Sequence, residues 1–299
     1  MPPAPCDTLR RQGYQFFSYS STAALKPCMW CKRALVGGDM CYKHQFYGIA
    51  SHRCVQMTPT LRCNQRCRFC WRSFEHEVPE KEECSPETIL AGIHRFQKKA
   101  LAGYNAVLDN TVTEERWHEA LDPKHVAISL SGEPTLYRQL PELIDMINLA
   151  GYTTFLVSNG TNPGVLTRCH PFQMYVSLDA PDEETYLSLC RPLENYWEEI
   201  KKSLKLLKAR RSAVRITLVK GLNDFKPERY AALLQESNPM FVEVKGYMYL
   251  GYSRKRLVRQ NMPEHGEVRS FAEKITAACD YRIKDENVLS RVVCLEREI

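Results

Sequence analysis

The sequence predicts an α/β fold in which six strand-then-helix units form a partial (βα)6 barrel of parallel strands, similar in plan to part of a TIM barrel. Three observations favour this fold class. Strand-like runs alternate with helical patterns, the length of 299 residues is usual for an α/β barrel, and no Gly/Ser-rich linker divides the chain. A hydrophobic content of 44% with 25% charged residues is typical of a globular chain with a sizeable core.

Six strand-like runs define the predicted sheet. They cover residues 56–62, 125–130, 153–158, 173–178, 213–219 and 240–246. Helical patterns cover residues 86–103, 139–150, 183–209 and 227–236. The first helix has a clear start, because Ser85 is a favoured N-cap residue and Pro86 suits the first helical position. Since strands and helices alternate, we expect neighbouring strands to run parallel.

The chain is expected to have three segments. Residues 1–55 form an N-terminal extension with spaced cysteines and little periodicity, residues 56–250 form the barrel, and residues 251–299 form a short C-terminal extension. No apolar run is long enough to span a membrane, and the N-terminus lacks the apolar core of a signal peptide. We therefore expect a cytoplasmic protein, in which clustered cysteines usually indicate metal binding or catalysis.

A polar segment directly follows each predicted strand. Catalytic residues of parallel barrels gather at the C-terminal ends of the strands, so these segments predict the site. They are CNQRCRFC (63–70), SGEP (131–134), SNG (158–160), SLDAP (177–181), VKGLN (219–223) and EVKGY (243–247).

Three cysteines, Cys63, Cys67 and Cys70, stand within eight positions after the first strand. Three thiols cannot all pair as disulfides, but they can bind one soft metal centre from a single loop. With 13 cysteines in 299 residues, this C-x-x-x-C-x-x-C spacing is expected by chance roughly 0.02 times. A zinc site would need a fourth nearby ligand, whereas three cysteines leave one iron of a four-iron cluster open to a small molecule.

The cysteine spacing resembles the motif of the radical S-adenosylmethionine superfamily, and SGEP resembles that superfamily's glycine-and-glutamate motif. The resemblance implies a [4Fe-4S] cluster that binds S-adenosylmethionine and cleaves it to a radical that abstracts hydrogen. It also implies that Glu133 and the neighbouring backbone receive the methionyl amino group. The expected cofactor-binding residues are Phe69, Gly132, Glu133, Pro134, Ser158 and Asn159.

Four further cysteines lie upstream: Cys28, Cys31, Cys41 and Cys54. Their spacing leaves two hypotheses open. All four can form a zinc knuckle, since C-x-x-C is a common half-site, or three of them can hold a second iron–sulfur cluster.

Longer motifs resemble the archaeal 4-demethylwyosine synthase family, which are lyases of tRNA modification. They include KPCMWCKRALVGGDMCYKHQFYGIASHRCVQMTP, RCNQRCRFCWR, SGEPTLY, FLVSNGTNP, YVSLDAP, RITLVKGLN and VEVKGYMYLGYS. The resemblance implies that Cys28, Cys41 and Cys54 hold an auxiliary [4Fe-4S] cluster and that Cys31 is a packing residue. It further implies that pyruvate carbons condense with N1-methylguanosine of tRNA(Phe) to give the tricyclic base 4-demethylwyosine, with electrons from an external donor such as ferredoxin or flavodoxin.

Lys43 is the predicted catalytic amine, because it lies two residues after Cys41 and would meet pyruvate bound at the auxiliary cluster. A Schiff base there would activate the ketone. Lys220 and Lys245, which follow the fifth strand and end the sixth, are rival amines.

The net charge of +6 permits a nucleic-acid partner. A basic run after the sixth strand is expected to contact tRNA, with a solvated loop as the alternative interpretation. Its members are Arg254, Lys255, Arg256 and Arg259. Two other functions compete: a radical enzyme acting on another substrate such as a small metabolite, and a zinc-stabilised nucleic-acid-binding protein without catalysis.

Overall fold

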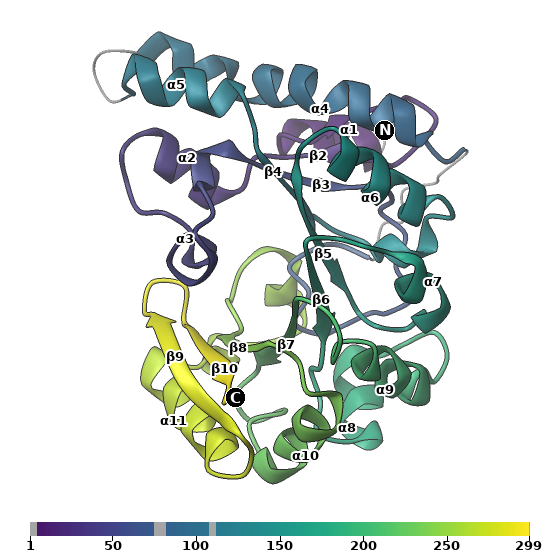
Figure 1. Ribbon diagram of the computed structural model, residues 1–299, viewed down its shortest axis with the longest axis vertical. Coiled ribbons are helices and arrows are strands. Elements are labelled where there is room, and N and C mark those ends of the chain that lie inside the picture. The colour runs from purple at the N-terminus through teal and green to yellow at the C-terminus, as the bar shows by residue number, and fades with distance from the viewer. Residues whose placement is uncertain (1–4, 75–81, 108–111, 299) are drawn as a thin grey trace. The chain divides into compact units, whose positions relative to one another are not determined.

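The computed structural model describes residues 5–74, 82–107 and 112–298. The chain forms two compact units (Figure 1). The first comprises residues 1–62, 76–157 and 168–172, and the second comprises residues 63–75, 158–167 and 173–299. Among the described residues, no helix is long and apolar enough to cross a membrane.

The strands of the first unit follow one another in sequence order, from β1 to β5. They are β1 (Gln15–Phe16), β2 (Ala24–Leu25), β3 (Cys54–Thr58), β4 (His125–Ile128) and β5 (Thr153–Ser158). The pairs β1–β2 and β2–β3 are antiparallel, whereas β3–β4 and β4–β5 are parallel. Its helices are α1 (Pro5–Arg11), α2 (Met29–Leu35), α3 (Tyr42–Tyr47), α4 (Pro86–Leu101), α5 (Glu114–Leu121) and α6 (Leu140–Leu149), with short 3-10 turns between some of them.

The register of the parallel strands places Cys54 on a defined face of the first unit. Cys54 pairs with His125, and Ala127 pairs with Phe155. Because alternate residues of a strand point to the same face, Cys54, His125, Ala127 and Phe155 share one face of this sheet.

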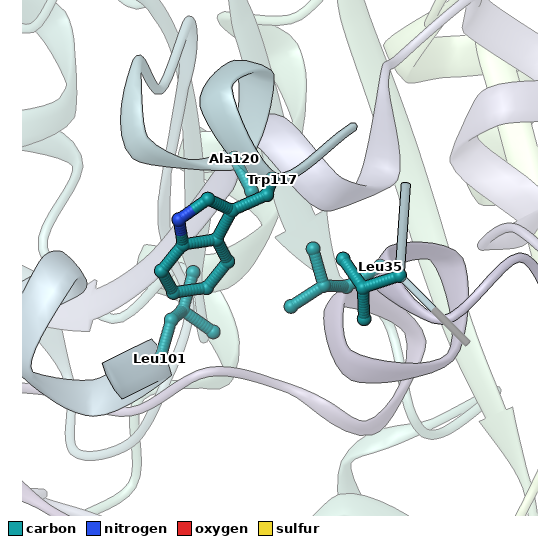
Figure 2. Packing of buried hydrophobic residues seen from close by; sticks show 5 residues of the cluster. Leu35, Leu101, Trp117 and Ala120 are labelled. Carbon is teal, nitrogen blue, oxygen red and sulfur yellow. The ribbon is translucent and has the colours of Figure 1, made fainter. Parts of the chain in front are cut away.

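Helix α2 is held in place by a hydrophobic cluster shared with α4 and α5. Figure 2 shows the side chains of Leu35, Leu101, Trp117 and Ala120 in this cluster, with the indole ring of Trp117 against Leu101. Val112 and Ala120 complete the buried part of the cluster. Burial of side chains of this size stabilises the fold by about 1.5–3 kcal/mol each, so this cluster holds α2 against α4 and α5.

The second unit has three parallel strands, β6 (Gln173–Ser177), β7 (Ser212–Leu218) and β8 (Phe241–Gly246). Strand β10 (Val292–Arg297) pairs antiparallel with β8, and β9 (Tyr281–Asn287) pairs antiparallel with β10. The yellow hairpin of β9 and β10 packs against α11 (Figure 1). The helices are α7 (Pro163–Arg168, all but its last residue in this unit), α8 (Glu183–Cys190), α9 (Trp197–Lys205), α10 (Pro227–Ser237) and α11 (His265–Thr276).

All six predicted strands appear, as β3 to β8, and the α/β fold class is confirmed. The predicted start of α4 is also confirmed, because the Ser85 hydroxyl accepts a hydrogen bond from the amide of Thr88 at 3.3 Å. The first strand, however, ends at Thr58, so four residues separate it from Cys63.

Other predictions of local structure were wrong. The single helix predicted at 183–209 is two helices, α8 and α9, because Arg191 adopts a left-handed conformation (φ 46°) and Pro192 disfavours a helix at the residue before it. The N-terminal segment contains helices and two short strands instead of irregular chain. Strand β9 escaped prediction because only Tyr281 of its seven residues is buried.

Candidate functional site

The cysteine loop (residues 63–74) lies in the second unit and is fixed by backbone hydrogen bonds to the end of α8. The amides of Arg66 and Arg68 donate to the carbonyls of Cys190 and Leu189 at 3.0 and 2.9 Å. The amide of Leu193 donates in return to the carbonyl of Asn64 at 2.9 Å. The break between α8 and α9 that the sequence did not reveal therefore supplies the partners of this loop.

The three cysteines of the loop are half-buried free thiols. The thiol of Cys67 hydrogen-bonds with the thiol of Cys190, and this contact together with burial raises the pKa of Cys67 well above its usual value. Cys70 lies within electrostatic range of Cys67, and Cys63 within range of Cys190. Cys190, interpreted from the sequence as an ordinary small apolar residue, is buried, but it is a direct neighbour of the loop.

The donor set of the loop fits a four-iron cluster, since three cysteines would each bind a different iron. In the described part of the chain, no three His, Cys, Asp or Glu side chains converge closely enough to hold one metal ion. Because metal binds the thiolate, occupation of the loop would release the proton that Cys67 now holds.

The SGEP segment, in the first unit, packs against the residues that lead into the cysteine loop. Gly132 has a φ of +75°, and a Cβ there would overlap the carbonyl oxygen of Thr60 and lie 2.7 Å from that of Arg62. The amide of Glu133 donates to the Arg62 carbonyl at 2.7 Å. The Glu133 carboxylate is buried and accepts hydrogen bonds from the amide and hydroxyl of Thr135 at 3.1 and 2.8 Å. Only glycine fits this close approach.

The SNG segment is tied to the cysteine loop within the second unit. Asn159 donates to the side-chain carbonyl of Asn64 at 2.9 Å, and Asn64 donates to the hydroxyl of Thr161 at 2.9 Å. The buried Ser158 hydroxyl accepts the amide of Gly160 at 3.0 Å. Phe69, in contrast, packs against the hydrophobic cluster formed by Leu189, Val219, Tyr247 and Leu257.

A pocket opens beside the loop in the second unit. Its polar lining comes from Gln65, Asn159, Ser177, Asp179, Tyr186 and Cys190. Burial raises the pKa of Asp179 to about 6, although its carboxylate accepts the amide of Thr217 at 2.7 Å. The sequence identifies SLDAP as a polar segment after a strand but predicts no role for Asp179, because a single aspartate forms no recognisable motif.

The upstream cysteines gather in the first unit. Cys28 and Cys41 precede the first residues of α2 and α3, and Cys54 begins β3. Burial raises the pKa of Cys28 and Cys54, and the thiols of Cys28, Cys31 and Cys41 lie near enough to Cys54 to raise its pKa further. Cys31 is fully buried, its thiol donates to the carbonyl of His52 at 3.8 Å, and burial raises its pKa to about 12.

Lys43 lies with these cysteines. Its ammonium group lowers the pKa of both Cys28 and Cys54 and lies 5.0 Å from the centroid of the Phe155 ring. Phe155 shares a sheet face with Cys54, so the amine stands on the side of the sheet where that cysteine points.

The rival lysines have other contacts. Lys220 is exposed and forms an ion pair with Glu267, which raises the pKa of Lys220. Lys245 donates to the carbonyl of Ser290 at 3.5 Å.

The four residues of the predicted tRNA-binding run differ in their surroundings. Arg254, Lys255 and Arg259 are exposed. Arg256 is half-buried, and its guanidinium binds the carbonyls of Cys70 and Arg72 within the second unit.

Comparison with known proteins identifies two families along the chain. The radical SAM superfamily model matches residues 57–234, and the model for wyosine base formation matches residues 236–297. The S-adenosyl-L-methionine-dependent tRNA 4-demethylwyosine synthase of Pyrococcus abyssi is 43% identical over 100% of this chain and 90% of its own length. The enzyme of the same name from Methanocaldococcus jannaschii is 40% identical over 97% of this chain and 94% of its own length. A solved structure of TYW1 with a lysine-pyruvate adduct bound is 39% identical, covers 100% of this chain and 97% of that chain, and has a TM-score of 0.91.

Replacement of Gly132 by alanine should destabilise the first unit, because the new Cβ would overlap backbone atoms at a left-handed φ. We expect a loss of about 2 kcal/mol or more in the free energy of unfolding, measured by urea denaturation. Gly103→Ala is the matched control in the same unit, since nothing lies within 4 Å of the place that its Cβ would take and its φ is not left-handed. Equal stability of Gly132→Ala and Gly103→Ala would contradict the close approach.

Proposed function

The chain belongs to the radical S-adenosylmethionine superfamily and, within it, to the tRNA 4-demethylwyosine synthases, and from that premise we propose which residues perform the reaction and on which tRNA. The chain is a radical enzyme of wyosine-base synthesis on tRNA. Its family membership disfavours both a radical enzyme acting on another substrate and a zinc-stabilised nucleic-acid-binding protein. The proposed substrates are pyruvate and N1-methylguanosine beside the anticodon of tRNA(Phe). The observation that carries the proposal is the gathering of Cys28, Cys54 and Lys43 in one place beside β3.

We assign the cluster that binds S-adenosylmethionine to Cys63, Cys67 and Cys70. A reduced four-iron cluster held there would supply the electron that cleaves S-adenosylmethionine to the radical that abstracts hydrogen. The protein's part is to orient the bound cofactor. Asn159, hydrogen-bonded to Asn64 of the same loop, is suited to hold a polar group of S-adenosylmethionine next to the cysteines.

For the SGEP segment we propose the role that the family resemblance implies, which is that Glu133 binds the methionyl amino group of S-adenosylmethionine. Glu133 is a buried carboxylate, and a carboxylate in that position favours a positively charged amino group as its partner. Gly132 allows the close packing of this segment on Arg62, and Pro134 begins the turn that the carboxylate caps. Phe69 acts through packing, and Ser158 through its turn with Gly160.

A second, auxiliary cluster is assigned to Cys28, Cys41 and Cys54. Cys28 and Cys41 both lie within electrostatic range of Cys54, and so does Cys31, so the support for leaving Cys31 out comes from its own contacts. The side chain of Cys31 contacts Gln97 at 3.9 Å and the His52 carbonyl, which suits a packing residue. The family resemblance implies the same three ligands. Together with the contacts of Cys31, it favours this assignment over the four-cysteine zinc knuckle.

Lys43 is proposed to form a Schiff base with pyruvate. Its amine nitrogen would add to the ketone carbon, and the ketone oxygen would leave as water, giving an imine. The lysine-pyruvate adduct in the related TYW1 structure supports an amine of this kind, and the neighbourhood of Cys54 supports Lys43. Lys220 is disfavoured because its ion pair with Glu267 keeps it protonated.

The exposed residues Arg254, Lys255 and Arg259 are proposed to bind tRNA phosphates. The methylated base would leave the stack to reach the reacting groups. Electrons would come from an external donor such as ferredoxin or flavodoxin.

Iron analysis tests the two ligand sets. The parental chain should bind about eight irons if each set holds a four-iron cluster. Cys28→Ala should lose about half of them and still cleave S-adenosylmethionine reductively, whereas Cys63→Ala should lose cleavage. Cys31→Ala is the matched control and should keep its iron. A loss of iron in Cys31→Ala as large as in Cys28→Ala would refute the auxiliary assignment.

Borohydride trapping tests the amine. Reduction in the presence of labelled pyruvate should attach the label to Lys43, because only an imine is reduced to a stable secondary amine there. Lys43→Ala should lose the label, and the control Lys220→Ala should keep it. Label found by peptide mass spectrometry on Lys220 or Lys245 would move the Schiff base to that residue.

The salt dependence of tRNA binding tests the basic run. Arg254→Gln should weaken binding and reduce the slope of log affinity against log salt by about one unit, since one phosphate contact is lost. Arg269→Gln removes an exposed charge from α11 and serves as the control. Parental affinity and slope in a variant lacking Arg254, Lys255 and Arg259 would exclude this surface.

A further inference from the structure

Two guanidinium groups bind the carbonyls of two cluster cysteines in the second unit. Arg66 donates from Nη1 to the carbonyl of Cys63 at 2.7 Å. Arg256 donates from Nη2 to the carbonyl of Cys70, and to that of Arg72 at 3.1 Å. The backbone carbonyls of the first and the last cysteine of the loop therefore each accept a hydrogen bond from a positively charged side chain.

Phe74 lies beside both guanidinium groups. The centroid of its ring is 4.1 Å from the guanidinium carbon of Arg256 and 5.7 Å from that of Arg66. Arginine combines stacking on an aromatic ring with several fixed donors, which a lysine cannot do. Phe74 thus helps to fix the orientation in which both groups face the loop.

The chain that carries Arg256 is itself held against the loop. The amide of Tyr252 donates to the Trp71 carbonyl at 2.8 Å, and a Cβ at Gly251, whose φ is +60°, would overlap that same oxygen. The amide of Arg256 donates to the carbonyl of the buried Ser253 at 3.0 Å. The segment 251–256 falls in the part of the chain that matches wyosine base formation, whereas the cysteine loop falls in the radical SAM part.

Charge near an iron–sulfur cluster changes its reduction potential. Reduction adds one negative charge, and nearby positive charge favours the reduced form, most strongly where water is partly excluded. Charge-assisted hydrogen bonds are also stronger than neutral ones and hold the backbone that presents the cysteines.

We propose that Arg66 and Arg256 are positioning residues that fix the cysteine loop and raise the reduction potential of the cluster held by Cys63, Cys67 and Cys70. The inference rests on the proposed assignment of that cluster. It separates Arg256 from the exposed Arg254, Lys255 and Arg259, because the Arg256 guanidinium donates to carbonyls of the loop. The segment specific to wyosine formation would in this way set how easily the radical reaction begins.

Redox titration followed by electron paramagnetic resonance tests the proposal on the full reconstituted chain. The signal to follow is that of the reduced cluster which changes when S-adenosylmethionine is added. Arg256→Gln should lower the equilibrium constant for one-electron reduction about tenfold, which corresponds to about 59 mV. Arg256→Lys keeps the charge and should lose less than threefold. The control Arg282→Gln removes an exposed charge on β9, far along the chain from the loop, and should leave the potential unchanged.

Several outcomes would decide the matter. A parental potential in Arg256→Gln with an intact cluster would overturn the proposal, as would an equal shift in Arg282→Gln. If Arg256→Gln does not assemble the cluster, Arg66→Gln tests the same charge at Cys63 and must lower the potential as well. A parental chain without any cluster that responds to S-adenosylmethionine would instead overturn the proposed function.

Discussion

The structure of the site depends on one constraint: the cysteine loop has no regular secondary structure, so its backbone polar groups need partners from other segments. The end of α8 binds the amides of Arg66 and Arg68, and the SNG segment binds Asn64. Arg256 binds the carbonyls at the far end. A loop whose backbone is held at several points has less conformational entropy to lose when a cluster binds.

The upstream cysteines are presented in a different way. Two of them precede short helices and the third begins a strand, so regular elements position all three. The packing of Trp117, Leu101 and Leu35 holds α2, and the sheet holds Cys54. Lys43 belongs to α3, the helix that Cys41 precedes, and is therefore positioned together with these cysteines. The chain thus presents one cysteine triplet from a loop held by hydrogen bonds and the other from two helix starts and the start of a strand.

Much of this could be predicted from the sequence where the signal is local. The strands from β3 to β8 have clear apolar runs, and the polar segments after them are short and dense in cysteine, glycine and asparagine. The roles of Cys190, Asp179 and Arg256 could not be predicted, because each depends on a contact between segments far apart in sequence. Arg256 looks like any member of a basic run until the carbonyls that it binds are known. Strand β9 was not predicted for a related reason: its sequence is mostly polar, and only its pairing with β10 identifies it as a strand.

We propose above that this chain joins pyruvate carbon to N1-methylguanosine in tRNA. The most direct measurement is anaerobic incubation with S-adenosylmethionine, pyruvate, a reductant and methylated tRNA(Phe), followed by mass spectrometry of the digested nucleosides. We expect a new nucleoside with the mass of 4-demethylwyosine, formed only when pyruvate is present. Cleavage of S-adenosylmethionine with the methylated guanosine left unchanged would contradict it.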